Sequence, residues 1–399
     1  MRAVRPPALL ALEDGSVFRG SSIGADGESG GEVVFNTSLT GYQEILTDPS
    51  YKGQIVTMTA PQIGNYGVNA ADAEAERPWV EGFVVRELSS VASNFRSDMA
   101  LDVYLRERGV VAIEGVDTRA VTRRLREKGA LRGVLSTTET NADALVDKAR
   151  AVPPMAGRDL VLEVTRRREQ VWTQALDARA FQPPMDFDGP VWDLVLVDYG
   201  AKWNILRNLT SVGFRVRVVP ADSTIETVLA SEPHAVFLSN GPGDPGAMPY
   251  AHALARGLLE TKMPVLGICL GHQLLGHGFG GTTFKLPFGH HGGNQPVMDL
   301  RTRKVEITAQ NHGFAVDPAL FAAGEVELTH VNLNDGSVEG MRHRTLPVMS
   351  VQYHPEAAPG PHDSLYLFRE FRKVLDSFHG AGPAPAAASD LRSARRSAR

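Results

Sequence analysis

A single cysteine at a tight strand-to-helix turn is the residue of this sequence best suited to chemistry. Cys269 is the only cysteine, and it lies at the centre of residues 267–271 (GICLG), directly after a short apolar run. Glycines two positions either side of a nucleophile suit a backbone that doubles back sharply, because a side chain there would collide. At the start of the helix that follows, free N–H groups and the helix dipole favour a thiolate. The pattern predicts a cysteine nucleophile, although a lone buried cysteine is more often structural.

A base and an orienting carboxylate for this thiol follow a predicted strand at residues 348–352, in the run Tyr353-His354-Pro355-Glu356. In an extended segment, residues i and i+2 point to the same side, so His354 and Glu356 can face one pocket. The carboxylate would then hold one imidazole nitrogen as a donor, and the other nitrogen would act on Cys269. Each piece is weak evidence alone, since an H-x-E run is a common accident. Together they predict a catalytic triad of Cys269, His354 and Glu356.

Acyl transfer also requires hydrogen-bond donors for the oxyanion that develops on the substrate. The backbone N–H of Leu270, directly after the nucleophile, is one candidate. A second could come from residues 239–246 (SNGPGDPG), where Gly241 and Gly243 would let the backbone approach a substrate. A plain tight turn is the alternative interpretation of that loop.

From residue 191 onward the pattern is typical of an α/β domain. Predicted strands at residues 192–197, 214–219, 235–238 and 265–268 alternate with helical stretches. This alternation indicates an open, mostly parallel twisted sheet, in which ligands bind outside the carboxyl ends of the strands. Residues 280–349 are more β-like, with strands expected at 305–308 and 325–331, and a final helix is expected at 364–378.

The N-terminal region predicts a β-rich domain. Residues 9–12 and 17–18 flank Asp14-Gly15, which suits a type I′ hairpin turn, and further strands are expected at 32–36, 54–58 and 82–85. Helices are expected at 98–108 and at 117–128, the second capped by Asp117 and ended by Gly129. We therefore divide the chain into an N-terminal domain (1–152), a linker (153–190), an α/β domain (191–379) and a disordered tail (380–399). An accessory domain without chemistry is the simplest interpretation of the first part.

Composition narrows the function further. The net charge of −5 argues against a general nucleic-acid binder, and the single cysteine rules out an intrachain disulfide and suits a reducing cytoplasm. No apolar run approaches the roughly 20 residues that span a bilayer. The pair His290-His291 suggests a metal, but no cysteine or carboxylate lies at ligand spacing, so we expect no metal site. Without a G-x-x-x-x-G-K-[ST] loop, nothing indicates ATP binding by this chain.

Four motifs resemble the signatures of class I, triad-type glutamine amidotransferases: NGPGDP (240–245), GICLGHQLL (267–275), QNHGFAV (310–316) and QYHPEA (352–357). Residues 31–51, 53–67, 114–133 and 358–363 are similar to the small subunits of carbamoyl-phosphate synthases in particular. The resemblance covers about residues 8 to 378. One departure is near Ala60 and Gln62, where an aromatic residue and a histidine would be expected; it touches no catalytic position.

This resemblance implies that Cys269 attacks the side-chain amide of L-glutamine, that His354 serves as base and acid, and that Glu356 orients it. The glutamine pocket of the family corresponds to Ser50, Gly241, Gly243, Leu270, Gln273, Asn311, Gly313 and Phe314. Ammonia is implied to pass to a separate large subunit, which makes carbamoyl phosphate from bicarbonate, ammonia and two molecules of ATP. ATP and Mg²⁺ would therefore lie on that subunit, with no cofactor on this chain.

Two alternatives to this function stay open. The chain could serve another synthase, such as one for anthranilate or GMP, although those glutaminase units need no comparable N-terminal extension. It could instead be a catalytically silent scaffold that stabilises its partner. Labelling of Cys269 by a glutamine-like electrophile would separate a scaffold from an active enzyme.

Overall fold

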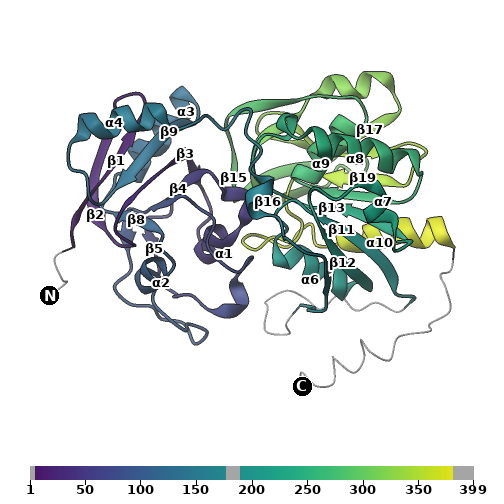
Figure 1. Cartoon of the computed structure of the whole chain (residues 1–399), viewed down its shortest axis with the longest axis horizontal. Coiled ribbons are helices and arrows are strands. Elements are labelled where there is room, and N and C mark those ends of the chain that lie inside the picture. Colours follow the sequence, from purple (N-terminus) through teal and green to yellow (C-terminus); the bar gives the residue numbers. More distant parts are fainter. Residues whose placement is uncertain (1–4, 177–188, 381–399) are drawn as a thin grey trace.

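The chain forms two lobes that lie side by side along its longest axis (Figure 1). The structure is a computed structural model and describes residues 5–176 and 189–380. The tail that the sequence predicts to be disordered lies outside these ranges, apart from Gly380, as does the middle of the predicted linker. None of the described helices is long and apolar enough to cross a membrane.

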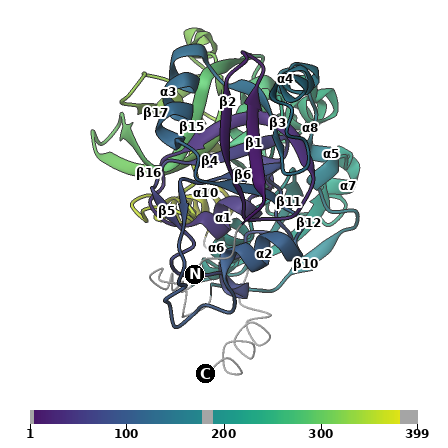
Figure 2. The same cartoon turned by 90° about the vertical axis from the view of Figure 1, so that its left-hand side faces the viewer.

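The N-terminal lobe is built on a closed barrel with the strand order β1-β2-β8-β6-β4-β3-β9. Figure 2 looks onto this lobe, with β1 and β2 in front. Apolar side chains fill the barrel interior, including Leu10, Val33 and Ile113, all fully buried. The elements of the lobe are β1 (Pro7–Leu12), β2 (Val17–Ser22), β3 (Glu28–Asn36), α1 (Tyr42–Thr47), η1 (Pro49–Tyr51), β4 (Gln54–Met58), β5 (Gln62–Ile63), η2 (Ala70–Asp72), β6 (Gly82–Val84), β7 (Glu87–Leu88), α2 (Leu101–Glu107), β8 (Val111–Glu114), α3 (Thr118–Lys128), β9 (Leu131–Ser136) and α4 (Ala142–Ala151).

The strands and helices predicted in this lobe are present, but one turn is wrong and strands β5, β7, β8 and β9 were not predicted. Strands β1 and β2 form the predicted hairpin, but the prediction of a type I′ turn is wrong. Only Gly15 has a positive φ, at 93°, whereas a type I′ turn needs two such residues; Leu12 N–H donates to Ser16 O and closes a three-residue loop instead. Helix α3 has the predicted Asp117 cap, whose side chain accepts from the Ala120 N–H. Helix α4 was not predicted.

The C-terminal lobe is a ten-stranded sheet with the order β10-β12-β11-β13-β14-β19-β18-β17-β15-β16. The strands from β12 to β19 pair in parallel, as predicted, while β10 and the strands from β18 to β16 add antiparallel edges. The elements are β11 (Trp192–Asp198), α6 (Trp203–Ser211), β12 (Phe214–Pro220), α7 (Ile225–Leu229), β13 (Ala235–Leu238), η3 (Pro245–Ala247), α8 (Pro249–Glu260), β14 (Val265–Ile268), α9 (Leu270–Gly278), β15 (Thr283–Asp299), β16 (Val305–Val316), η4 (Pro318–Ala323), β17 (Val326–Asn332), β18 (Val338–His343), β19 (Val348–Val351) and α10 (Leu367–His379).

Helices cover both faces of the parallel strands. Leu194 and Leu196 of β11 pack with α6 and α10 on one face, whereas Val195 and Val197 pack with α8 and α9 on the other. This burial on both faces explains why the strands are continuously apolar. The edge strands are partly solvated, so they show weaker patterns, and β15 and β18 were not predicted.

The segment predicted to be a linker is partly built into the fold. It contains α5 (Val161–Val164) and β10 (Gln170–Trp172), and β10 pairs antiparallel with β12, so the sheet begins before residue 191. Met155 and Leu160 are buried with Phe314 of the C-terminal lobe. The proline and arginine content of this segment suggested a solvated connector. The few apolar residues that pack against the C-terminal lobe were not recognisable from that composition.

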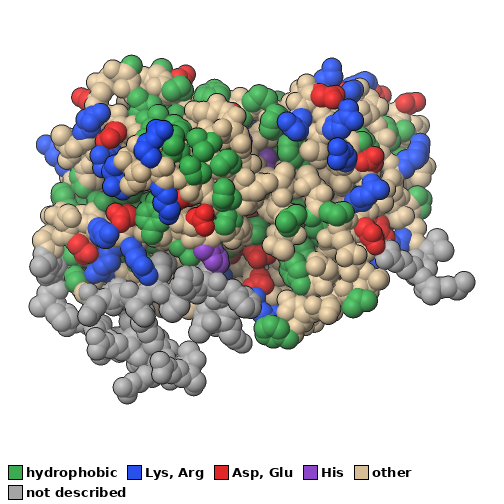
Figure 3. Space-filling model, turned by 180° about the vertical axis from the view of Figure 1, so that it is seen from behind, with side chains coloured by type: hydrophobic (Ala, Val, Ile, Leu, Met, Phe, Trp, Pro, Cys, Tyr) green, Lys and Arg blue, Asp and Glu red, His purple; other side chains and the backbone are tan. Residues whose placement is uncertain are grey.

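Strand β15 joins the lobes. Lys285 Nζ lies 2.8 Å from a Glu32 carboxylate oxygen, and the Thr37 N–H donates to His291 O at 3.1 Å. On the face seen from behind, Lys and Arg side chains are interspersed with Asp and Glu over both lobes (Figure 3). A surface of mixed charge agrees with the small net charge of the chain.

Candidate functional site

Cys269 occupies the sharp turn between β14 and α9 that the sequence predicts. Its own backbone is left-handed, with φ 53° and ψ −106°, so the strain resides on the cysteine rather than on the flanking glycines. A Cβ at Gly267 would lie 2.9 Å from the carbonyl carbon and oxygen of Gly271, and a Cβ at Gly271 would lie 2.1 Å from Leu238 O. The glycines are therefore required by close backbone approach.

This close approach gives a testable steric prediction. Gly271→Ala should lower the free energy of unfolding by roughly 2 kcal/mol or more, because the new methyl group meets a backbone oxygen that cannot rotate away. Denaturant unfolding would measure the loss. Gly278→Ala is the matched control on the same helix, since its methyl group would meet only side-chain and backbone atoms at 3.1 Å or more. Equal stability of the two variants would contradict the steric account.

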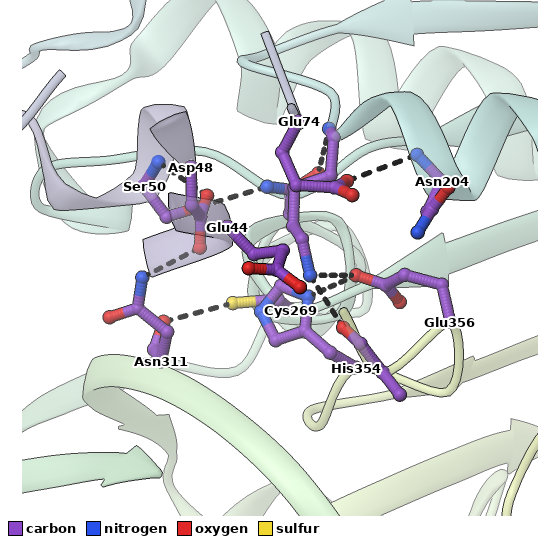
Figure 4. Close-up of polar contacts among 12 residues, drawn as sticks. Glu44, Asp48, Ser50, Glu74, Asn204, Cys269, Asn311, His354 and Glu356 are labelled. Carbon is purple, nitrogen blue, oxygen red and sulfur yellow. Dashed lines mark hydrogen bonds and ion pairs between the residues drawn. The ribbon is translucent and has the colours of Figure 1, made fainter. Parts of the chain in front are cut away.

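His354 and Glu356 face Cys269 from the segment after β19 (Figure 4). His354 Nδ1 lies 2.7 Å from Glu356 Oε1, and the His354 N–H donates to Ala309 O, which fixes the segment against β16. Burial disfavours the charged imidazole, but the Glu356 carboxylate and the Cys269 side chain outweigh it and raise the pKa of His354 to about 10. In this geometry His354 holds a proton at neutral pH and presents Nε2 toward the sulfur.

Lys202 has no catalytic signature in the sequence, but the structure brings it to the triad. It is buried, and its Nζ lies 2.9 Å from Glu356 Oε1 and 2.7 Å from Ala357 O. Burial raises the pKa of Glu356, but Lys202 and His354 dominate and lower it to about 2. The carboxylate thus stays ionised between two cations. The position of Lys202 shortly after β11, at the carboxyl edge of the sheet, is the one feature of the sequence that could have indicated a role in the site.

The N-terminal lobe reaches this site through Ser50 and Asp48. Asn240 Nδ2 donates to Ser50 Oγ at 2.9 Å, and Asn311 Nδ2 donates to Asp48 Oδ2 at 2.9 Å. These bonds confirm that Ser50 lies at the boundary between the lobes. Neither Asp48 nor Asn240 was predicted to be a site residue, although they lie in residues 31–51 and 240–245, which resemble the family motifs.

Two further acids of the same lobe, Glu44 and Glu74, lie beside the triad (Figure 4). Glu74 Oε2 accepts from the Asn204 N–H at 3.0 Å, and burial raises the pKa of Glu74 to about 7. Burial likewise raises the pKa of Glu44 to about 8. Both lie in polar stretches without any catalytic signature, so the sequence held no signal for them.

The predicted glutamine pocket gathers around α9 and β16. Gln273 Nε2 donates to Phe314 O at 2.7 Å, and Asn311 O lies 3.7 Å from the Cys269 sulfur. A Cβ at Gly241 would lie 2.8 Å from a Leu270 methyl group, which places this glycine beside the turn. Gly243, with φ 93°, abuts the backbone of residues 158–160, next to Phe314. A Cβ at Gly313 would lie 3.7 Å from Lys285 Nζ, an ordinary van der Waals contact, so this position is not crowded.

A small cavity of about 20 Å³, with room for about one water-sized molecule, lies against His354 at the boundary between the lobes. Both lobes line it, with Asn36, Ser38 and Asp48 on one side and Lys202, Asn311 and Pro359 among those on the other. Only a molecule about the size of water, released at Cys269, would find room there, next to His354.

The raised pKa of His354 predicts how stability responds to alkali. The folded chain keeps this proton up to about pH 10, whereas an exposed histidine loses it near 6.5. Below about pH 8.5 the unfolded chain keeps a proton on the Cys269 thiol, which offsets the proton that the folded pair carries on His354. Stability falls with pH wherever the folded state binds more protons, so the free energy of unfolding should fall mainly from about pH 8.5 to about pH 10, by on the order of 1 kcal/mol per pH unit. Glu44 adds a slope of the same sign at lower pH, between about 4.5 and its folded pKa of about 8.

Denaturant unfolding across this range would measure the slope. Histidines whose pKa is lowered by burial, such as His272 and His291, are neutral in both states there and add no slope. His354→Gln is the comparison, because it removes one titrating group and should flatten the curve. An unchanged slope in that variant would contradict the assignment of the proton.

Comparison with known proteins gives consistent matches over nearly the whole chain. Residues 10–135 match the family described as carbamoyl-phosphate synthase small chain, CPSase domain, and residues 195–374 match glutamine amidotransferase class-I. The carbamoyl phosphate synthase small chain of Aquifex aeolicus is 53% identical over 93% of this chain and 99% of its own length. That of Akkermansia muciniphila is 54% identical over 92% and 97%.

Proposed function

Because this chain belongs to the carbamoyl phosphate synthase small chain family, we propose that it is the glutaminase subunit of such a synthase. It would hydrolyse L-glutamine and deliver the ammonia to a large subunit that makes carbamoyl phosphate from bicarbonate, ammonia and ATP. The observation that carries this proposal is the strained Cys269 facing His354, whose other ring nitrogen lies 2.7 Å from Glu356.

The proposed reaction proceeds through a thioester. The Cys269 sulfur attacks the amide carbon of the glutamine side chain, while its proton resides on His354. The oxyanion is held by the N–H groups of Leu270, in the first turn of α9, and of Gly241. His354 then protonates the leaving nitrogen and ammonia departs. Next, His354 takes a proton from water, which attacks the thioester, releasing glutamate and restoring the thiol. Glu356 holds the imidazole throughout.

The glutamine backbone groups would be held by the remaining pocket residues. We assign this role to Ser50, Gly241, Gly243, Gln273, Asn311, Gly313 and Phe314. The support is their arrangement at the start of α9 and along β16, and the hydrogen bond that ties Ser50 to Asn240. Since Ser50 comes from the barrel lobe, both lobes would be needed to bind glutamine.

Ammonia would leave through the cavity beside His354 toward the large subunit. We place ATP and Mg²⁺ on that subunit and propose that hydrolysis on this chain needs no cofactor. A cytoplasmic location fits, because a thiol nucleophile must stay reduced.

Labelling with a glutamine-like electrophile, an amino acid with a chloroketone in place of the amide, tests the proposal. We expect one label per chain, on Cys269, formed rapidly and blocked by L-glutamine. Cys269→Ser is the control and should take up none. A catalytically silent scaffold would instead label slowly, without protection by glutamine. Copurification of a large synthetase with the native chain would separate this function from that of another amidotransferase.

A further inference from the structure

A second cluster of chemically capable side chains lies away from the triad, on the antiparallel part of the sheet. His290 on β15, His312 on β16 and Glu339 on β18 are all buried, and one potential ligand atom of each lies within 4.8 Å of the others. The two histidines are cross-strand partners in the β15–β16 ladder, with ring centroids 4.9 Å apart. We propose that these three residues bind one divalent transition-metal ion of the zinc type.

Both imidazoles are arranged as metal-binding histidines are, with one nitrogen fixed by an oxygen acceptor and the other directed into the cluster. His290 Nε2 lies 2.9 Å from an Asp335 carboxylate oxygen, and His312 Nδ1 lies 2.8 Å from Phe314 O. Within the described parts of the chain, no hydrogen bond reaches His290 Nδ1, which lies 3.7 Å from Glu339 Oε1. His290 Nδ1 therefore faces the buried carboxylate, while one nitrogen of His312 lies within 4.8 Å of the other two ligand atoms.

The hydrogen bonds of His312 are incompatible with a neutral ring on its own. Nδ1 faces the Phe314 carbonyl and Nε2 faces Gln310 Oε1 at 3.0 Å, so the ring lies between two acceptors. A neutral imidazole has a single N–H, so it can donate to only one of these two oxygens. The side-chain amide of Gln310 cannot be rotated to turn its Nε2 toward His312, because Nε2 already donates to Glu339 Oε1. A cation between Nε2 and Gln310 Oε1 would satisfy both lone pairs.

Glu339 supplies the negative charge. It is fully buried, and its Oε1 accepts from Asn332 Nδ2 at 2.8 Å as well as from Gln310. Its Oε2 has no hydrogen-bond partner among the residues that the structure describes. A divalent ion would compensate this buried carboxylate, which otherwise carries a large desolvation cost.

The donor set selects the class of metal. Two imidazoles with one carboxylate suit Zn²⁺, Co²⁺ or Ni²⁺ rather than Mg²⁺ or Ca²⁺, which prefer oxygen ligands alone. Tetrahedral binding places ligand atoms about 3.4 Å apart, so side-chain rotation must close the cluster by roughly 1 Å. The sequence predicted no metal here because no carboxylate stands near the His290-His291 pair; Glu339 approaches only through the pairing of β15, β17 and β18.

The ion would act structurally. His312 holds Phe314 O together with Gln273, so a metal on His312 would fix one wall of the proposed glutamine pocket without entering the reaction. The inference rests on the geometry of the cluster and does not depend on the proposed glutaminase activity.

Metal titration of the purified full chain tests the proposal, in a Cys269→Ser background so that no thiolate can bind the ion. After treatment with a chelator, the chain is titrated with Co²⁺ and then Zn²⁺, followed by visible absorption and by metal content after gel filtration. We expect one equivalent of Co²⁺ with the absorption of a four-coordinate ion, displaced by Zn²⁺. Glu339→Gln should weaken binding at least tenfold, and Asp335→Asn about tenfold through its hold on His290.

His379→Gln is the matched control, since this histidine lies on α10, away from the cluster, and its side chain hydrogen-bonds the His234 carbonyl. It should leave the titration unchanged. Binding below about 0.1 equivalent, or equal affinity in Glu339→Gln and the parent chain, would overturn the proposal. If Glu339→Gln fails to fold, as judged by circular dichroism, the Asp335→Asn titration decides in its place, because that side chain is partly exposed and lies outside the cluster.

Discussion

Cys269→Ser should abolish glutamine-dependent carbamoyl phosphate synthesis by the complex of this chain with a large subunit, while ammonia-dependent synthesis is retained. Serine is nearly isosteric and can occupy the turn, whose shape is set by Gly267 and Gly271. Its hydroxyl, however, does not ionise readily enough for His354 to hold its proton before attack. Removing the nucleophile from a catalytic unit should lower the glutamine-dependent rate by roughly 10³-fold or more.

The two rates are compared on the same preparation, with L-glutamine or an ammonium salt as the nitrogen source. The ammonia-dependent rate is the internal control, because it reports an intact large subunit and an intact complex. Denaturant unfolding of the variant should match that of the parent chain. If glutamine supports the full rate in Cys269→Ser, then Cys269 is not the nucleophile and the proposed mechanism fails.

The parts of the site that could be predicted are those encoded within a few residues. The turn at Cys269 follows from two glycines and an apolar strand, and the pairing of His354 with Glu356 follows from the alternation of an extended chain. The parallel strands were found for a similar reason, since burial on both faces makes them continuously apolar. In each case the local pattern and the tertiary environment require the same residues.

The parts that could not be predicted depend on contacts between distant segments. Lys202 resembles a surface charge until β11 and the loop after β19 bring it to Glu356. Glu74 reaches the site only because the barrel lobe packs against α6, where its carboxylate accepts from Asn204. Glu339 likewise becomes a neighbour of His290 only through strand pairing. No local pattern in a sequence reports such distances.

Lys202→Met should be the most destabilising of the substitutions considered for this site. The ammonium group compensates Glu356, which is fully buried, and methionine fills a similar volume without a charge. Breaking a buried ion pair by removing one partner leaves an uncompensated charge and costs about 3–5 kcal/mol. Glutamine-dependent synthesis should fall as well, because a protonated Glu356 no longer holds His354 as a proton acceptor, while ammonia-dependent synthesis should persist.

The double variant Lys202→Met/Glu356→Gln removes both charges. It therefore distinguishes an uncompensated charge from lost packing as the cause of the instability. Denaturant unfolding should find the double variant more stable than Lys202→Met alone. The pH dependence gives an independent sign. The lowered pKa of Glu356, about 2 against 4.5 for an exposed glutamate, contributes stability that is present above 4.5 and is lost as the pH falls through 2. The loss of unfolding free energy in Lys202→Met should therefore become smaller in acid. A loss that does not change with pH would show that Lys202 stabilises the fold by packing and that the ion pair with Glu356 contributes nothing.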